Sequence, residues 1–93
     1  MTIPKKIKIG GHWFKIVYKH EYEDAYDKSG SRFSWSNKIF LQSDMEQSKK
    51  ESVLFHEILH ELSWQHHLDL SEAVAASIAE GMYQVLKDNR FLK

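Results

Sequence analysis

The stretch that decides the fold of this 93-residue chain is His56-Glu57-Ile58-Leu59-His60. It lies in a run, residues 43–80, that contains neither Pro nor Gly, which favours a helix. Residues four apart share one face of a helix, so His56 and His60 can point their imidazoles at one metal ion. Glu57 lies about 100° further round the helix. Its carboxylate can therefore reach a water beside the metal, which is the arrangement of a zinc hydrolase.

The flanking residues predict two helices. Ser48-Lys49-Lys50-Glu51 reads as a capping box, and apolar residues follow it with helical spacing, so we expect a first helix at Lys49–His66. A second helix is predicted at Leu70–Lys87, with Asn89 as its C-cap. The apolar stripe of this second helix consists of Val74, Ala75, Ile78, Ala79, Met82, Val85 and Leu86.

The residues before the helices predict a β-hairpin. Lys5–Ile9 alternates apolar and basic residues, and His12–Tyr18 is rich in β-branched and aromatic residues. Between them stands Gly10-Gly11, which is typical of a primed two-residue turn.

A second pair of short strands is predicted at Arg32–Trp35 and Lys38–Leu41, joined at Ser36-Asn37. Residues 19–30 are polar and acidic without periodicity, which indicates a long loop or one helical turn. Strands followed by two helices predict one α+β domain over residues 1–93. We expect a small antiparallel sheet with both helices on one side of it.

Composition excludes several kinds of site. The chain has no Cys, which excludes disulfides, Cys-ligated zinc and a thiol nucleophile. The formal net charge is zero, which argues against nucleic acid or an anionic membrane as the main partner. We interpret the lysines of the first 20 residues as solvated strand faces. No secretory or transmembrane stretch stands out, so we expect a cytoplasmic monomer in a bacterial or phage-infected cell.

Catalytic zinc usually takes three protein ligands, and His66 is one candidate for the third. It completes the pattern H-E-x-x-H-x-x-G-x-x-H except that Ser63 replaces the Gly. Without that Gly the helix is expected to continue, and His66 then lies about 120° round the helix from His60.

Glu72 is the other candidate for the third ligand. It falls about 90° from the centre of the apolar stripe, at the border of a face that we expect to pack on the first helix. Glu80 falls nearly opposite the stripe and is expected to face solvent. A structural role for Glu72 stays open, because Asp69-Leu70-Ser71-Glu72 also reads as a capping box.

At this point the chain resembles a known group. The segments His56–Glu61, Ser71–Val74 and Ile78-Ala79 resemble small zincin metallopeptidases of the gluzincin type and are similar to ImmA/IrrE-type proteins. The opening K-K-I-K-I-G-G and the closing Gly81–Asn89 resemble short phage and prophage metallopeptidases. Val74 stands where the ImmA/IrrE pattern has Asn.

The resemblance implies a minimal zincin-like domain with a specific ligand set. His56, His60 and Glu72 would bind zinc, and Glu57 would be the base.

These features predict a zinc-dependent metallopeptidase that hydrolyses a peptide or protein substrate, with Glu57 as general base. The substrate would add as a strand to an edge at Lys38–Leu41. Trp35, Phe40 and Trp64 would line side-chain pockets or pack in the core. The alternative is a non-catalytic zinc-stabilised protein-binding module, for example a phage protein that captures a host factor, in which four protein ligands close the metal site.

Overall fold

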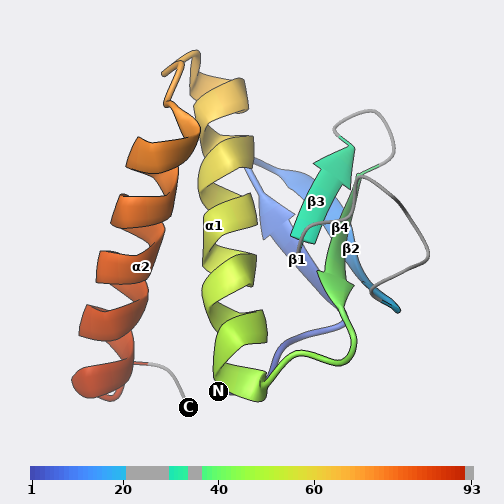
Figure 1. Ribbon diagram of the computed structural model, residues 1–93. Helices are drawn as coiled ribbons and strands as arrows, with labels where there is room; N and C mark the ends of the chain where they lie inside the picture. Colours follow the sequence, from blue (N-terminus) through green and yellow to red (C-terminus); the bar gives the residue numbers. More distant parts are fainter. Residues whose placement is uncertain (21–29, 34–36, 92–93) are drawn as a thin grey trace.

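The computed structural model describes residues 1–20, 30–33 and 37–91, and in this part of the chain four strands precede two helices (Figure 1). The elements are β1 (Lys6–Ile9), β2 (His12–Lys19), β3 (Gly30–Phe33), β4 (Lys38–Gln42), α1 (Gln47–His66) and α2 (Glu72–Asp88). The predicted α+β class is therefore confirmed. Most of the expected loop (residues 21–29), Trp35 and Ser36 lie outside the described residues.

The first hairpin forms as predicted, with Ile9 paired to His12 across the turn. Gly10 and Gly11 have φ values of 60° and 84°, and positive φ at both central positions is the primed turn that glycine adopts without strain. A Cβ at Gly10 would also displace the amide of Gln65 on α1, whose Nε2 donates to the Ile9 carbonyl at 3.1 Å.

The sheet is mixed, with strand order β1-β2-β4-β3, so the prediction of a purely antiparallel sheet was wrong. β2 and β4 pair in parallel, whereas β1–β2 and β3–β4 are antiparallel. The reason is that the chain leaves β2, skips the neighbouring position to form β3, and returns through β4. Lys38–Leu41 is consequently a central strand and not the predicted edge. The edges are β1 and β3.

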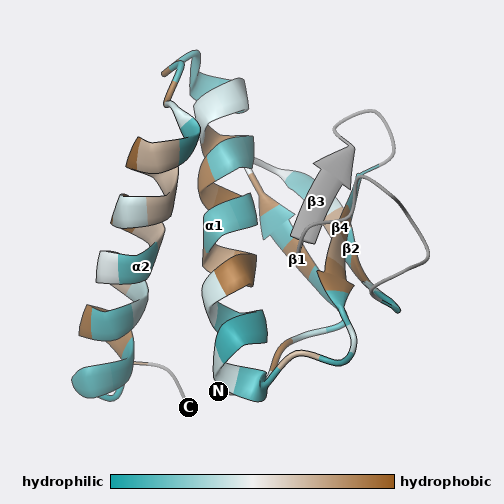
Figure 2. Ribbon diagram, in the orientation of Figure 1, coloured by the Kyte–Doolittle hydropathy of each residue, from teal (hydrophilic) through white to brown (hydrophobic). Residues whose placement is uncertain are grey.

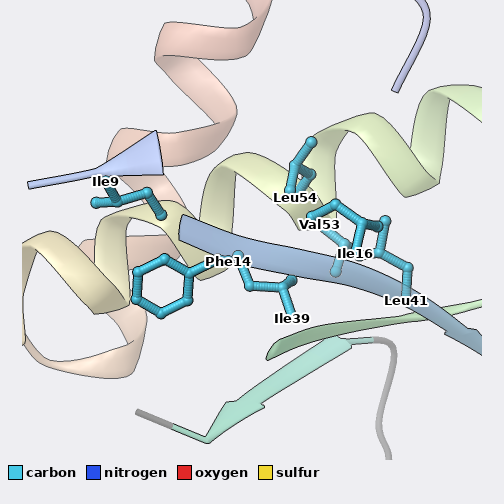
Figure 3. Close-up of a cluster of buried hydrophobic side chains, with 7 residues drawn as sticks. All are labelled: Ile9, Phe14, Ile16, Ile39, Leu41, Val53 and Leu54. Atoms are coloured by element: carbon cyan, nitrogen blue, oxygen red, sulfur yellow. The ribbon is translucent and has the colours of Figure 1, made fainter. Parts of the chain in front are cut away.

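The core lies between one face of the sheet and α1 (Figures 1 and 3). Successive side chains of a strand point to opposite faces, so alternate residues of β2 and β4 meet the helix. Ile39 and Leu41 on β4 are completely buried. The buried cluster consists of Ile9, Phe14, Ile16, Ile39, Leu41, Val53 and Leu54. This packing fixes how α1 is rotated on the sheet, and therefore which of its residues face α2.

The start of α1 differs from the prediction. The helix begins at Gln47, its N-cap is Glu46 without a side-chain cap bond, and Ser48 lies inside the first turn. Glu51, expected to close a capping box, instead accepts a 2.5 Å hydrogen bond from the Tyr83 hydroxyl on α2. The Glu51 carboxylate therefore binds the buried Tyr83 hydroxyl of the other helix and not the backbone N–H at the exposed start of its own helix.

α2 packs on α1 and, among the described residues, makes no contact with the sheet (Figure 1). Its buried residues are Ala75, Ala79 and Tyr83. Small alanines let the two helices approach closely, which turns the packed face away from the centre of the predicted stripe, towards Glu72 and Glu80. The outer side of α2 is apolar but exposed (Figure 2). It carries Val74, Ile78, Met82 and Val85, which are 43–54% exposed. The C-cap is Asn89, as predicted.

In the described part of the chain, neither helix has the combination of length and apolarity that a bilayer-spanning segment needs.

Candidate metal centre

His56 and His60 lie one turn apart on the side of α1 that is turned towards the start of α2. Their Nε2 atoms are 2.9 Å apart, and the rings stack with centroids 4.7 Å apart. Their side chains are 22% and 23% exposed, so both are partly covered yet open to solvent. The predicted pairing of these two imidazoles on one helical face is therefore present in the structure.

Glu72, the first residue of α2, closes the group. Its Oε1 lies 2.8 Å from His56 Nε2, and its Oε2 lies 2.8 Å from His60 Nε2. In the part of the chain that the structure describes, these three residues are the one group whose potential ligand atoms gather within 4.8 Å of one another. Helices separated by a loop thus bring together the residues predicted as ligands.

Ser71 positions Glu72. Ser71 is the N-cap of α2, and its Oγ accepts a hydrogen bond from the Val74 backbone N–H at 3.2 Å. The alternative of an Asp69 cap is not realised, because α2 begins at Glu72, two residues after the expected Leu70, and Asp69 lies before the cap with φ 55°. Side chains of a helix tilt towards its N-terminus, so Glu72 projects back over the loop towards the imidazoles. Its carboxylate then lies on the His pair and does not close a capping box.

Ser63 holds the loop between the helices, a role that sequence reasoning missed. It is buried; its Oγ accepts from the Leu70 N–H and its carbonyl from the Leu68 N–H, both at 3.0 Å. His67 has a left-handed conformation, φ 54°, which ends α1 as a glycine often does. From the sequence, Ser63 was interpreted only as the residue that replaces Gly in the pattern H-E-x-x-H-x-x-G-x-x-H. A hydroxyl in the last turn of a helix before a short loop is the signal that could have indicated this role.

His66 and Glu80 lie outside the group. α1 continues through Ser63 to His66, as predicted, and His66 is exposed and not among the three gathered residues. Glu80 was predicted to face solvent; it is exposed, but it also has a partner on α1. Its Oε2 accepts a 2.6 Å hydrogen bond from Ser52 Oγ on α1, and this bond lowers the pKa of Glu80. The rotated packing of α2 explains this difference.

Glu57, the predicted base, is 7% exposed and follows His56 directly on α1. Glu61, one turn further on, is 3% exposed and accepts from Gln65 Nε2 at 2.9 Å. The same Nε2 reaches the Ile9 carbonyl, which ties this side of α1 to the sheet. The helix therefore places Glu57 beside the imidazole pair on a well-anchored segment, but more deeply than the imidazoles.

The chemistry of the gathered atoms fits zinc. A neutral imidazole Nε2 and a carboxylate oxygen each offer a lone pair, and here three residues direct such atoms at one point. Ligand atoms bound tetrahedrally to zinc at 2.0–2.1 Å would be roughly 3.4 Å apart. The two Nε2 atoms are 2.9 Å apart, about half an ångström closer than this. Each lies 2.8 Å from a different oxygen of Glu72, and one ligand atom from each of the three residues lies within 4.8 Å of the others. Two His and one carboxylate are a donor set found in catalytic zinc sites.

A hollow of about 390 Å³ adjoins the group. It is lined by His60, Ser63, Trp64, His67, Asp69 and Leu70. Trp64 is 62% exposed, so it is a wall of this hollow and not a core residue, whereas Phe40 is buried in the sheet. A larger hollow of about 450 Å³, bordered by Ser52 and Tyr83, contains none of the three gathered residues. Of these two hollows, the smaller one adjoins the group.

No protein-family model matches this chain, no curated protein matches its sequence, and no solved structure matches its fold. The resemblance to zincins therefore rests on the motif and on the geometry of the site.

Proposed function

We propose that this protein is a zinc-dependent peptide hydrolase in which His56, His60 and Glu72 bind the metal. The observation that supports this most strongly is the convergence of the two Nε2 atoms and the Glu72 carboxylate from two helices. Zinc held there would act as a Lewis acid on the scissile carbonyl and on the attacking water. Three protein ligands in the described part of the chain agree with a catalytic site, which keeps one position for water or substrate.

Glu57 would act as the general base. It takes the proton of the attacking water and passes it to the leaving amine, so its carboxylate must reach the water while staying off the metal. Its position beside His56, but not on the ligand face, is suited to this division of roles.

The sheet offers the peptide substrate an edge on the β4 side, and that edge is β3. A peptide that adds as an extra strand would therefore pair with the backbone of Gly30–Phe33 instead of Lys38–Leu41. The hollow next to His60, with Trp64 in its wall, would receive one substrate side chain.

A non-catalytic zinc-stabilised binding module is the second candidate, and the burial of Glu57 favours it. A carboxylate that is 7% exposed could serve the fold of α1 on the sheet and never meet substrate. In that case the metal would join α1 to α2, and the exposed outer side of α2 would be available to a protein partner.

The variant Glu57→Gln separates the two functions, because it keeps the shape and removes the base. We expect zinc content and melting temperature to stay close to those of the parent protein, while hydrolysis of an unfolded protein substrate falls by a factor of about 10²–10⁴. The matched control is Glu46→Gln at the exposed N-cap of α1, which should retain full activity. Absence of hydrolysis in both the parent and the variant, with zinc bound, would favour the binding module.

A further inference from the structure

The face of the sheet that points away from α1 carries four exposed lysines, Lys6, Lys8, Lys15 and Lys38, which we call the lysine face. Their positions follow from strand alternation. The residues next to them, such as Ile9, Phe14 and Ile39, are buried against α1, so the lysines must point to the other side. The lysine face is thus separated from the candidate metal centre by the sheet and by the body of α1.

Three of these lysines stand in register across three strands. Lys6 pairs with Lys15 on β2, and Lys15 pairs with Lys38 on β4. Directly opposite side chains lie about 4.5–5.5 Å apart at Cβ, and like charges at that separation destabilise a sheet. The four strands contain no Asp or Glu, and none of the four lysines forms an ion pair with another described residue. This concentration of positive charge is balanced by no described neighbour.

An exposed aromatic ring stands among these lysines. Trp13 pairs with Lys8 across the β1–β2 ladder and is 51% exposed. The Nζ atoms of Lys6 and Lys8 lie 4.5 Å and 5.5 Å from its ring centre. An open hollow of about 380 Å³ beside the ring is lined by Lys5, Lys6, Trp13, Lys15 and Asn37. The face therefore combines cations with a planar apolar surface that a flat ligand can reach.

We propose that the lysine face binds a short segment of single-stranded nucleic acid, independently of the metal centre. The row Lys6–Lys15–Lys38 would contact backbone phosphates, and an unpaired base would stack on Trp13. Proteins that bind single strands without sequence preference combine a positive track with aromatic stacking platforms in this way. The zero net charge of the chain is no obstacle, because the charge is distributed unevenly and the strands carry only its positive part.

An anionic membrane is the weaker partner for this face. Binding to a bilayer surface gains from several apolar side chains that enter the headgroup region. The described lysine face offers one exposed aromatic ring, and two ammonium groups flank it. A ring in these surroundings is better placed to stack on a base whose phosphates satisfy the same two lysines.

The proposal is tested by fluorescence anisotropy of a labelled 15-nucleotide oligothymidylate with the full chain at about 50 mM salt, where contacts with phosphates are strong. We expect Lys15→Glu/Lys38→Glu to bind at least tenfold more weakly. The control Lys49→Glu/Lys50→Glu makes the same change of net charge on α1 and should bind within about twofold of the parent, since it leaves the phosphate contacts intact. Circular dichroism and melting temperature establish that both variants are folded.

Two further measurements identify the ligand chemistry. Trp13→Ala should weaken binding about tenfold, as the loss of a stacking platform does. With three or four phosphates neutralised, the logarithm of the affinity should fall with the logarithm of salt concentration with a slope of about −2 to −3.

The following results would overturn the proposal. One is no binding of the oligonucleotide at 50 mM salt, and another is equal weakening by both charge-reversal pairs. A third is binding of heparin as tight as that of the oligonucleotide together with no effect of Trp13→Ala, which would mean an unspecific polyanion patch. Binding to vesicles with phosphatidylserine but not to the oligonucleotide would assign the face to a membrane.

Discussion

Two carboxylates on the two helices stand at opposite ends of the same helix pair, and their surroundings differ in kind. Glu51 on α1 is 3% exposed and accepts hydrogen bonds from the Tyr83 hydroxyl at 2.5 Å and from Gln47 Nε2 at 3.1 Å. The side chain of Glu72 on α2 is 73% exposed and faces two imidazole nitrogens. Hydrogen-bond donors satisfy Glu51, whereas Glu72 faces two imidazole nitrogens that, with Nε2 unprotonated, would offer lone pairs to a shared cation. The chemistry of the partners, and not burial, distinguishes a structural carboxylate from a candidate ligand.

The titration of the Glu51 pair supports this distinction. Burial raises the pKa of Glu51, but the hydrogen bonds from Tyr83 and Gln47 lower it, and the net result is a pKa below the usual value. Burial and the hydrogen bond to Glu51 raise the pKa of Tyr83. At neutral pH the pair is therefore a carboxylate and a protonated phenol. Lys87, with Nζ 3.0 Å from the Tyr83 oxygen, adds a second donor to this end of the helix pair.

The largest expected difference between the Glu72 end and the Glu51 end of the helix pair is in zinc affinity. Removing a residue that supports a metal ligand costs 10–100-fold in affinity, so removing a ligand itself should cost about 100-fold or more. We expect Glu72→Ala to weaken zinc binding by at least this factor, and Glu51→Gln to leave the affinity of the folded protein unchanged. Competition with a chromophoric zinc chelator measures both constants.

His66→Ala is the matched control for this experiment. It removes an imidazole from the same helix, but one that is exposed and outside the gathered group, so affinity should stay within about twofold, as for a residue that touches no ligand. If His66→Ala releases the metal and Glu72→Ala does not, the assignment of the third ligand to α2 is wrong.

The second effect is the pH dependence of stability at the Glu51 end. A carboxylate whose pKa is lowered by folding stabilises the protein above its unfolded pKa, near 4.5, and this contribution disappears as pH falls through the lower folded pKa. Glu51→Gln should therefore lose about 1.5–3 kcal/mol at pH 7, the range for hydrogen bonds to a charged group. The difference between parent and variant should shrink below about pH 4.

Urea denaturation at pH 7, 5, 4 and 3, with zinc removed by chelation, measures this difference. Glu80→Gln is a suitable comparison, because the pKa of Glu80 is also lowered and its carboxylate also accepts a bond from α1, but at an exposed position. A constant difference between Glu51→Gln and the parent at all four pH values would contradict the linkage.

The same contrast shows what the sequence could reveal. The relative placement of His56, Glu57 and His60 on α1 was predictable, because the spacing of residues on one helix fixes the directions of their side chains. The capping box at Ser48 was mispredicted, and the alternative box at Asp69 does not form. Both motifs are local, whereas the carboxylates of Glu51 and Glu72 have partners on the other helix. Helix packing decided both cases, and it depends on how closely two alanines allow the helices to approach.

The parallel pairing of β2 with β4 was unpredictable for a related reason. A hairpin turn such as Gly10-Gly11 predicts that the two strands beside it pair in antiparallel fashion, because the turn and both strands are contiguous in sequence. No local signal marks a strand that returns to the middle of a sheet after a neighbour has formed at its edge. Among the described strands, this placement also makes β3, instead of β4, the edge on that side of the sheet.

The smallest effect tests how the start of α2 is fixed. Ser71 Oγ accepts from the Val74 N–H, so Ser71→Ala should cost about 1 kcal/mol of stability, within the 0.5–2 kcal/mol range of N-cap substitutions. Asp69→Gly removes the carboxylate of the alternative cap but tolerates the φ of 55°, so it should cost less than about 0.5 kcal/mol. Urea denaturation of the zinc-free proteins compares the two directly. Because the cap also sets where Glu72 begins the helix, Ser71→Ala should weaken zinc binding slightly, while Asp69→Gly should not. The reverse order of the two stabilities would restore the Asp69 capping box and imply that Glu72 turns back towards the backbone at the start of α2, away from the imidazoles.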